Sequence, residues 1–355
     1  MAVAIRRVDA TIAPPSAPAP AQIPLALLHL MPALVRAMRA SAPARSGRVG
    51  RMSAYHLGWT DAEGRPADAG GGKFLRGCLT LWAAERCGGS PDAALPAAAA
   101  VEWIHNFTLV HDDIQDGDRE RRHRPTVWVI WGAAQAINAG DGMHANAYRA
   151  LLCGSGRSQA RLRAAATLNT AVLAVIEGQC LDLALEGRVD TTVSTYLRLA
   201  RGKTGALIGG ALGAGAVMGG ARSAQADLLR RAGVELGVAF QVRDDWLGMW
   251  GDQAVTGKAN DGDLERRKLT YPVVAALQRL AGPARRELKQ LYRSRGDSSD
   301  RIRALLDEAG ARAAVAAELE SRGALAVELV RRSGMAGGAV ADFESIVHFV
   351  TARTA

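Results

Sequence analysis

Two short acidic clusters, each set within an apolar helical pattern, constrain this chain more than any other feature of its sequence. Residues 112–116 read Asp-Asp-Ile-Gln-Asp, and residues 241–245 read Gln-Val-Arg-Asp-Asp. On an α-helix, positions i, i+1 and i+4 project from nearly the same face. Carboxylates held this close repel one another, and one of them is pushed towards protonation. The clusters therefore predict hard cations, with Mg2+ the best match, and a phosphorylated ligand between them.

The composition and periodicity of the 355-residue chain favour an all-α fold. Apolar residues make up 48% of it and aromatic residues only 5%, and β-branched runs are scarce. Glycine-rich breaks separate segments with helical periodicity. These segments predict helices over 73–88, 92–116, 133–153, 160–187, 192–220, 223–250, 270–280, 284–293, 299–308, 310–333 and 340–352. We expect a helical bundle around a deep apolar cavity with a charged mouth.

The N-terminal segment differs in composition from the rest of the chain. Residues 1–50 are expected to form a disordered, basic, Pro/Ala-rich arm with room for one short helix within 23–41, and residues 51–355 to form one domain. Residues 1–60 hold seven arginines and one acid, which is most of the formal net charge of +9. The arm is interpreted either as a passive tail or as a segment that docks to another protein.

Other bulk features limit location and partners. The high pI says little about the folded body, and no nucleic-acid partner is expected. A transmembrane helix is not expected either, since no run of 18 uncharged apolar residues occurs. The four cysteines show no paired spacing, which argues against a zinc site or a disulfide framework. These features predict a reduced, cytoplasmic setting.

Cations and one histidine accompany the acidic clusters. Lys73 and Arg76 follow a triple glycine whose backbone N–H groups could hold phosphate oxygens, and His105 shares a helical stripe with Asp112 and Asp116. The full inventory comprises Asp112, Asp113, Asp116, Asp244, Asp245, Lys73, Arg76, Arg121, Arg122, Lys203, Lys258, Lys268 and His105. An acidic helix end neutralised by nearby arginines remains the alternative for the first cluster. The whole set suits two diphosphates with several Mg2+ ions better.

Seven motifs in order resemble one known family, the trans-isoprenyl diphosphate synthases, or polyprenyl synthetases. They span roughly residues 55–350 and comprise Gly-Gly-Lys73-Phe-Leu-Arg76, His105 to Asp116, Arg121-Arg122-His-Arg-Pro125, Asn-Ala-Gly140-Asp141, Lys203-Thr204-Gly205, Phe240 to Asp245, and Thr-Gly257-Lys258 with Lys268. The resemblance implies an isoprenoid synthase-type helical bundle and a homodimer. It also implies a short-chain enzyme that joins isopentenyl diphosphate to an allylic diphosphate and releases pyrophosphate.

The resemblance also implies roles for individual residues. Asp112 and Asp116 would hold two Mg2+ ions and Asp244 a third, with Asp113 and Asp245 completing the metal sets and Mn2+ able to substitute. The allylic diphosphate would be bound by Arg121, Lys203 and Lys258, and isopentenyl diphosphate by Lys73, Arg76, His105 and Arg122. Lys268 is also predicted to bind substrate. Lys203, Thr204 and Gln241 would face the carbocation, and these three with Arg121 form the predicted catalytic set.

Product length is predicted from the residues before the first aspartate. In this family an aromatic residue five positions earlier tends to accompany C20 products, and Phe107 holds that position beside the small Thr108. We therefore expect geranylgeranyl diphosphate, with farnesyl diphosphate as the next candidate. An ordinary core role for Phe107 is the competing interpretation.

Two departures from the family pattern occur, and two other functions stay open. Gly248 stands where a third aspartate is usual in the second cluster, and Gly77 replaces a frequent proline, a change interpreted as neutral. One alternative is a class I terpene cyclase, which would not need Lys73, Arg76, His105 and Arg122. The other is a non-catalytic subunit of a heteromeric synthase, which Gly248 alone suggests.

Overall fold

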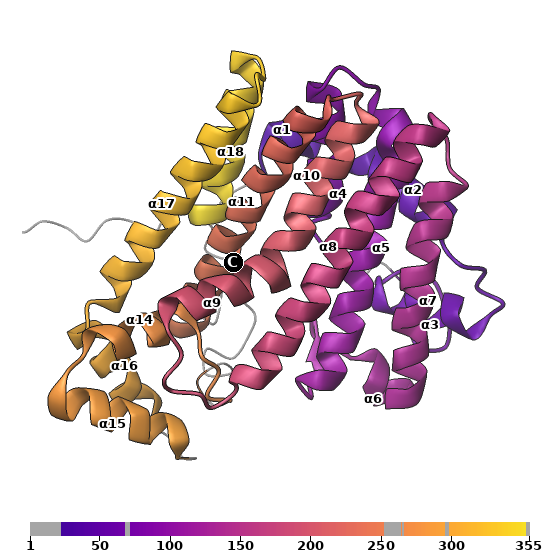
Figure 1. The fold of residues 1–355 in the computed structure, drawn as a ribbon. Coiled ribbons are helices and arrows are strands. Elements are labelled where there is room, and N and C mark those ends of the chain that lie inside the picture. The colour runs from indigo at the N-terminus through magenta and orange to yellow at the C-terminus, as the bar shows by residue number, and fades with distance from the viewer. Residues whose placement is uncertain (1–22, 68–71, 252–263, 265, 295–297, 353–355) are drawn as a thin grey trace, which may run out of the picture.

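Long α-helices build almost all of the structure, a computed structural model that describes residues 23–67, 72–251, 264, 266–294 and 298–352 (Figure 1). The helices are α1 (Leu25–Leu28), α2 (Met31–Ser41), α3 (Arg48–His56), α4 (Leu75–Arg86), α5 (Pro91–Gln115), α6 (Val127–Trp131), α7 (Ala133–Leu152), α8 (Ser158–Leu185), α9 (Val193–Ala200), α10 (Ala206–Met218), α11 (Ser223–Trp250), α14 (Tyr271–Arg279), α15 (Gly282–Arg293), α16 (Ser299–Glu308), α17 (Ala311–Arg332) and α18 (Gly337–Ala352). A π-helix, η1 (Arg201–Gly205), joins α9 to α10. The expectation of an all-α fold is confirmed.

The described helices match the predicted ones closely, with a few differences. The one short helix expected within 23–41 is two helices, α1 and α2. The predicted helix 192–220 is divided into α9, η1 and α10. The short helices α3 and α6 were not predicted, nor was the hairpin of β1 (Glu120–Arg121) and β2 (Arg124–Pro125). Arg122 and His123 form its turn with φ values of 54° and 58°. Positive φ at both central residues is typical of a type I′ turn, which Asn-Gly would have signalled and Arg-His does not.

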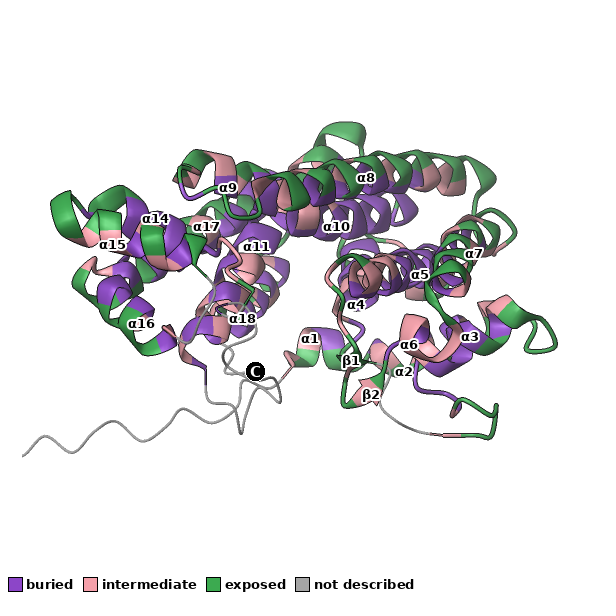
Figure 2. Cartoon of the chain, turned by 90° about the horizontal axis from the view of Figure 1, so that it is seen from below, coloured by how far each residue is buried: buried purple, intermediate pink, exposed green. Residues whose placement is uncertain are grey.

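Helix α10 forms the centre of the bundle. Every residue from Leu207 to Met218 is buried, and the helix contacts α4, α8 and α11 (Figure 2). Such close packing needs small side chains. A Cβ at Gly215 would lie 2.1 Å from the backbone oxygen of Thr80 in α4. The Gly/Ala-rich sequence of α10 therefore lets the helices that carry the acidic clusters approach one another across the core.

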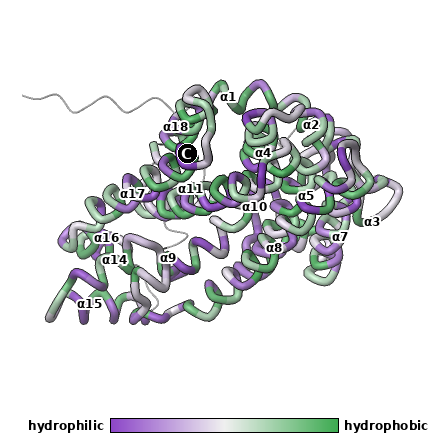
Figure 3. Tube along the Cα trace, turned by 45° about the horizontal axis from the view of Figure 1, so that its top comes forward, coloured by the Kyte–Doolittle hydropathy of each residue, from purple (hydrophilic) through white to green (hydrophobic). Residues whose placement is uncertain are grey.

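Helices α14, α15 and α16 form a smaller body with its own apolar cluster, which includes Leu277, Leu288, Tyr292, Ile302 and Leu305. Hydrophilic and hydrophobic positions alternate along α15, as expected for a helix with one solvated face (Figure 3). The body joins the main bundle through α14, which contacts α9, α11 and α17. Tyr271, the first residue of α14, lies beside the second acidic cluster, because its backbone N–H donates to Asp245.

The folded body begins earlier than the predicted boundary at residue 50. Leu27 in α1 and Leu34 and Met38 in α2 are completely buried in the main core. Trp103 of α5 donates a hydrogen bond of 3.0 Å to the hydroxyl of Ser41, which ties the end of α2 to the bundle. Residues 25–41, which the sequence analysis assigned to the arm, form α1 and α2, and the apolar faces of these helices pack against α4 and α5. Residues 1–22 lie outside the described residues.

Helix α8 is exceptional in its exposure. It is the one helix among the described residues that is long and apolar enough to cross a membrane by length and composition, and 33% of its apolar window is buried. Its outer face is exposed along much of its length (Figure 2). The exposed apolar side chains include Leu162, Leu173, Ile176 and Leu183.

Candidate active site

The first acidic cluster lies at the C-terminal end of α5. Its last turn carries Asp112 and Asp113, and Asp116 is the C-cap residue. Carboxylates at this end oppose the helix dipole, so they require nearby positive charge. Burial raises the pKa of Asp112, while Lys203 opposes this shift and Asp116 adds to it. Lys268 lies 3.9 Å from Asp116, measured from Nζ to Oδ2.

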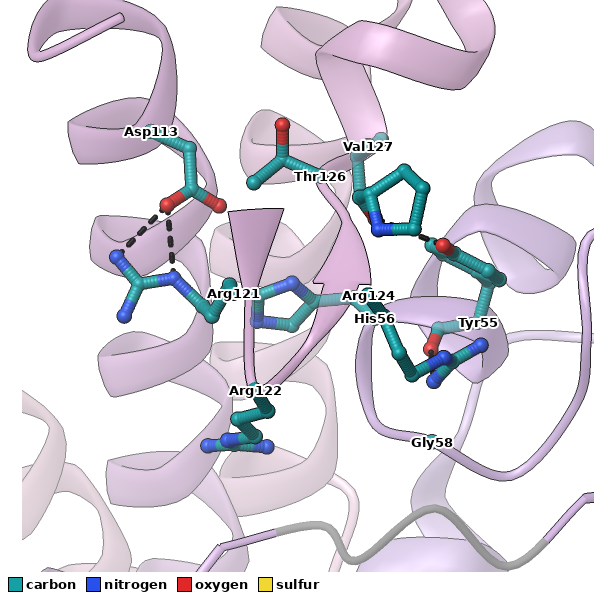
Figure 4. Close-up of a pocket in the computed structure, with 10 residues that line it drawn as sticks. Tyr55, His56, Gly58, Asp113, Arg121, Arg122, Arg124, Thr126 and Val127 are labelled. Carbon is teal, nitrogen blue, oxygen red and sulfur yellow. Dashed lines mark hydrogen bonds and ion pairs between the residues drawn. The ribbon is translucent and has the colours of Figure 1, made fainter. Parts of the chain in front are cut away.

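Asp113 points towards Arg121 of the hairpin (Figure 4). It is 1% exposed, and Arg121 donates to its Oδ1 atom from Nε and Nη2, each at 2.7 Å. Burial outweighs this pairing and raises the pKa of Asp113 to about 6. Asp113 is thus placed to orient Arg121, which makes this role a better fit than the predicted one as a metal ligand.

The second acidic cluster occupies the last turns of α11. Asp245 is 5% exposed and accepts hydrogen bonds from the backbone N–H of Tyr271 at 2.7 Å and from Nε2 of Gln241 at 2.9 Å. The hydroxyl of Tyr196 also donates to Asp245. Gln241 in turn accepts a hydrogen bond of 2.6 Å from the hydroxyl of Thr204. Asp245 is therefore a buried acceptor that holds its neighbours in place, whereas the adjacent Asp244 is only partly buried.

The π-helix η1 carries Lys203 and Thr204 between the two clusters. Lys203 donates to Asp182 of α8 at 2.5 Å, and Lys268 lies 3.8 Å from the same carboxylate. The wide π-helical turn packs directly against α8 at Gly178, where only a glycine fits. A Cβ at Gly178 would lie 2.2 Å from the backbone nitrogen of Lys203. Isolated π-helical turns occur frequently at functional sites. Here the turn places Lys203 beside the carboxylates of α5 and α8.

A separate group of cations gathers at the N-terminus of α4. Arg76 Nη1 lies 3.1 Å from Nε2 of His105, and burial, together with Arg76 and Arg121, lowers the pKa of His105 well below its usual value. Arg122 packs against the backbone of Gly72, whose φ is +98°. A Cβ added to Gly72 would lie 2.8 Å from Nη2 of Arg122. The structure thus gathers Arg76, His105 and Arg122 into one group.

The buried carboxylate of Glu102 supports this cation group. It accepts a hydrogen bond of 2.7 Å from the backbone N–H of Gly77. Burial raises the pKa of Glu102, and the Gly77 N–H, Arg76 and Arg122 each counteract that shift. An added Cβ at Gly77 would also lie 2.5 Å from Leu34. Gly77 is therefore not a neutral replacement for proline in this chain.

We expect the Gly77→Pro variant to lower the free energy of unfolding by about 1–3 kcal/mol, because Glu102 would lose its backbone partner. Urea denaturation measures this loss. Gly337→Pro is the matched control, since it falls at the first position of α18, where proline is tolerated and where nothing lies near an added Cβ. A Gly77→Pro protein as stable as the wild type would show that the contact between Glu102 and the Gly77 N–H contributes nothing to the free energy of unfolding.

A cavity of about 600 Å³ opens beside the first cluster. Its lining includes Asp116, Asp182, Tyr196, Leu199 and Lys268. Arg266 also lines it and forms an ion pair with Asp118, which links the segment before α14 to the end of α5. A second, much smaller cavity of about 20 Å³ lies between His56, Asp113 and Arg121 (Figure 4). The larger cavity therefore places space for a ligand next to both carboxylates and cations.

Several site residues were missed by the sequence analysis. Asp182 and Gln179 sit three positions apart on α8, and Gln179 donates to Gln115 of α5 at 2.9 Å. Two polar residues at this spacing, which places them on one face of the helix, were the available signal. Glu102 had a similar signal, as a lone acid among buried apolar neighbours. The predicted Lys258 lies outside the described residues.

Comparisons with known proteins place the chain in a family. The model for polyprenyl synthetases matches residues 67–309. A geranylgeranyl diphosphate synthase of Mycobacterium tuberculosis is 47% identical over 243 residues, covering 68% of this chain and 69% of that protein. A (2E,6E)-farnesyl diphosphate synthase of Mycobacterium bovis is 39% identical over 308 residues, 85% of each chain. The crystal structure of a polyprenyl synthetase from Streptomyces coelicolor superposes with a TM-score of 0.82 at 39% identity, covering 91% of this chain and 97% of that one.

The helical bundle with its paired acidic clusters has the all-α isoprenoid synthase fold. The chain belongs to the polyprenyl synthetase family and is a trans-prenyltransferase.

Proposed function

We propose that the protein condenses isopentenyl diphosphate with an allylic diphosphate in a Mg2+-dependent reaction, giving a C15–C20 trans-prenyl diphosphate and pyrophosphate. The observation that carries the proposal is the presence of two separate cationic groups. Lys203 and Lys268 lie among the carboxylates of Asp116 and Asp182, while Arg76, His105 and Arg122 gather near the N-terminus of α4. Two anionic substrates need two such groups.

The donor set fits Mg2+. No group of three acidic, histidine or cysteine side chains that could hold a metal ion occurs among the residues that the structure describes. Mg2+ commonly takes one or two carboxylates and completes its octahedron with water and substrate phosphate oxygens. Asp112 and Asp116 would provide such ligands on one side and Asp244 on the other, with three ions per site and Mn2+ as a substitute. When bound, these ions would neutralise the departing diphosphate.

The protein's own groups would then guide the reaction. Arg121, Lys203 and Lys268, together with Lys258, would bind the diphosphate as the allylic C–O bond breaks. The double bond of isopentenyl diphosphate, held by Lys73, Arg76, His105 and Arg122, would form the new C–C bond with the allylic carbon. A proton then leaves to the released pyrophosphate. The oxygens of Thr204 and Gln241 would face the transient positive charge, and Asp245 would hold Gln241 in place.

The favoured product is geranylgeranyl diphosphate. Phe107 is 7% exposed and is held edge-to-face by His111 and by His144 of α7, with ring centroids 5.7 Å and 4.9 Å apart. Thr108 beside it donates its hydroxyl to the backbone of His105 at 2.8 Å. A ring held this firmly could act as a fixed floor for a growing chain. The relatives include both farnesyl and geranylgeranyl synthases, which supports the C15–C20 range.

We expect the Phe107→Ala variant to make products longer than those of the wild type, because removal of the ring would extend the space available to the chain. Mass spectrometry of the diphosphates measures the length. Phe349→Ala, which truncates a buried aromatic residue of α18, controls for general loss of core packing. An unchanged product from the Phe107→Ala variant would leave this residue as ordinary core.

We also infer a homodimer formed through α7 and α8. Six apolar side chains on these helices are exposed, namely Ile137, Leu152, Leu162, Leu173, Ile176 and Leu183. An apolar face of this extent on a single chain is typical of an interaction surface. A cytoplasmic location is proposed too, since all four cysteines are free.

The Leu173→Glu variant should shift the protein from dimer to monomer, because the introduced carboxylate would be buried between two copies. Sedimentation equilibrium measures the mass. Leu325→Glu, at an exposed position of α17, should leave the dimer intact. A monomeric wild type would contradict the inferred interface.

The direct test of the proposed function is a product assay with isopentenyl diphosphate and dimethylallyl, geranyl or farnesyl diphosphate. C15 or C20 diphosphates would support the proposal and identify the preferred primer. Hydrocarbons or alcohols formed without isopentenyl diphosphate would instead indicate a terpene cyclase. Inactivity with every primer would favour a non-catalytic subunit and would make Gly248 the position to restore to aspartate.

A further inference from the structure

A ring of polar contacts connects the second acidic cluster to the π-helix by two routes. The short route uses residues already described: Asp245 binds Gln241, and Gln241 accepts from Thr204 of η1. The long route begins at the same carboxylate, which accepts the backbone N–H of Tyr271 at 2.7 Å. Tyr271 is the first residue of α14, so both its backbone and its side chain are placed by the start of that helix.

The long route continues through four charged side chains. The hydroxyl of Tyr271 donates to Glu318 of α17 at 3.0 Å, and Glu318 accepts from Arg322 one turn later at 2.6 Å. Arg322 reaches across to Glu235 of α11 at 2.8 Å. The side chains of Glu318, Arg322 and Glu235 are only 15%, 16% and 11% exposed. Each charge is therefore paired away from bulk water, where losing one partner is costly.

The ring closes at the π-helix. Glu235 accepts two hydrogen bonds from Arg201, at 2.8 Å and 3.0 Å, and Arg201 is the first residue of η1. Lys203 lies between Arg201 and Thr204, the two residues at which the long and short routes reach η1. The ring thus ties η1, α11, α14 and α17 into one unit around Lys203 and the second cluster.

We propose that Tyr271, Glu318, Arg322, Glu235 and Arg201 are positioning residues that hold Lys203 and the second acidic cluster at a fixed separation. This inference rests on the proposed function, in which both elements meet the same metal-bound allylic diphosphate. Tyr271, Glu318 and Arg322 act through Asp245 and η1, with no contact to substrate. Groups that orient ligating carboxylates typically affect metal affinity by about 10- to 100-fold.

The test is a comparison of wild type with the Tyr271→Phe and Glu318→Gln variants. Tyr271→Phe removes the hydroxyl that joins Glu318 while keeping the backbone N–H on Asp245 and the ring contact with Tyr196. We expect the Mg2+ concentration for half-maximal activity and the KM for the allylic diphosphate to rise about 10-fold. The KM for isopentenyl diphosphate should stay within about twofold, because its proposed site lies outside the ring. The double variant should be little worse than either single variant, because both break the same link.

The control is Arg331→Met, which removes an exposed ion pair between Arg331 of α17 and Glu344 of α18 and should change none of these constants. A wild type that needs no divalent metal would refute the proposed function itself. A metal-dependent wild type with unchanged Mg2+ and allylic constants in both variants would overturn the ring proposal alone. So would a loss of activity that only follows the folded fraction, because a merely structural ring would produce it. If Tyr271→Phe fails to fold, Glu318→Gln decides the question, since it keeps the size of the side chain and removes the negative charge that pairs with Arg322.

Discussion

The Asp112→Asn variant should lose about 1,000-fold in kcat, equivalent to roughly 4 kcal/mol of transition-state stabilisation. The substitution removes one negative charge from the end of α5, where Lys203 and Asp116 are the main charged neighbours of Asp112. Under the proposed function it also removes a ligand that holds the metal against the departing diphosphate. The loss should appear in kcat more than in the KM for isopentenyl diphosphate, because the Arg76–His105–Arg122 group is separate. Steady-state kinetics at saturating Mg2+ measure both.

Asp227→Asn provides the matched control for this prediction. Asp227 is an exposed residue of α11 whose carboxylate pairs with Arg230 three residues later at 2.7 Å. An exposed pair of this kind contributes little, so the control should keep wild-type kinetics and stability. Near-normal turnover by Asp112→Asn would show that the first cluster is not the site of diphosphate activation.

The Gly178→Ala variant is the second change with a large expected effect. Its Cβ would lie 2.2 Å from the backbone nitrogen of Lys203 and 2.6 Å from the carbonyl carbon of Gly202. Backbone atoms cannot give way as a flexible side chain can, so η1 or α8 must move. A displacement of about 1 Å at a positioned group can cost on the order of 100-fold in rate. We expect a loss of that order in kcat and a fall of about 1–3 kcal/mol in the free energy of unfolding.

A control variant distinguishes displacement of Lys203 from general damage to the packing. Gly338→Ala, in α18, adds the same methyl group where nothing lies within 4 Å, and it should be neutral or slightly stabilising. Kinetics and urea denaturation of both variants make the comparison. A fully active Gly178→Ala enzyme would mean that the close contact of α8 with η1 does not set the geometry of Lys203.

Much of the helical architecture could be predicted from the sequence because glycine-rich breaks coincide with real helix ends. Helix α11 has the same bounds in the prediction and in the structure, residues 223–250. The break at η1 could not be predicted, because its five residues continue the local helical pattern. The π-helical turn depends on glycines from other helices, such as Gly178 of α8 and Gly237 of α11, whose added Cβ would lie 2.5 Å from Gly205. Such contacts are tertiary and leave no periodic signal.

The candidate site divides in a similar way. Asp112 and Asp113 are adjacent in the sequence and were predicted to share one role, but tertiary packing turns Asp113 towards Arg121 on a hairpin that was not predicted. Asp182 and Glu102 were overlooked because single acids on helices acquire meaning only from their partners, here Lys203 and the Gly77 backbone. The sequence thus predicted which residue types gather, while the structure distinguishes the groups that face the cavity from those that hold them.

The most direct test of the account is to measure incorporation of labelled isopentenyl diphosphate into product together with the pyrophosphate released, in the presence of an allylic diphosphate and with Mg2+ either supplied or chelated. The proposed reaction releases one pyrophosphate for every five-carbon unit incorporated, so we expect that ratio, with both signals lost on chelation and restored by added Mg2+. Pyrophosphate release without incorporation of isopentenyl diphosphate, or incorporation that persists without divalent metal, would contradict it.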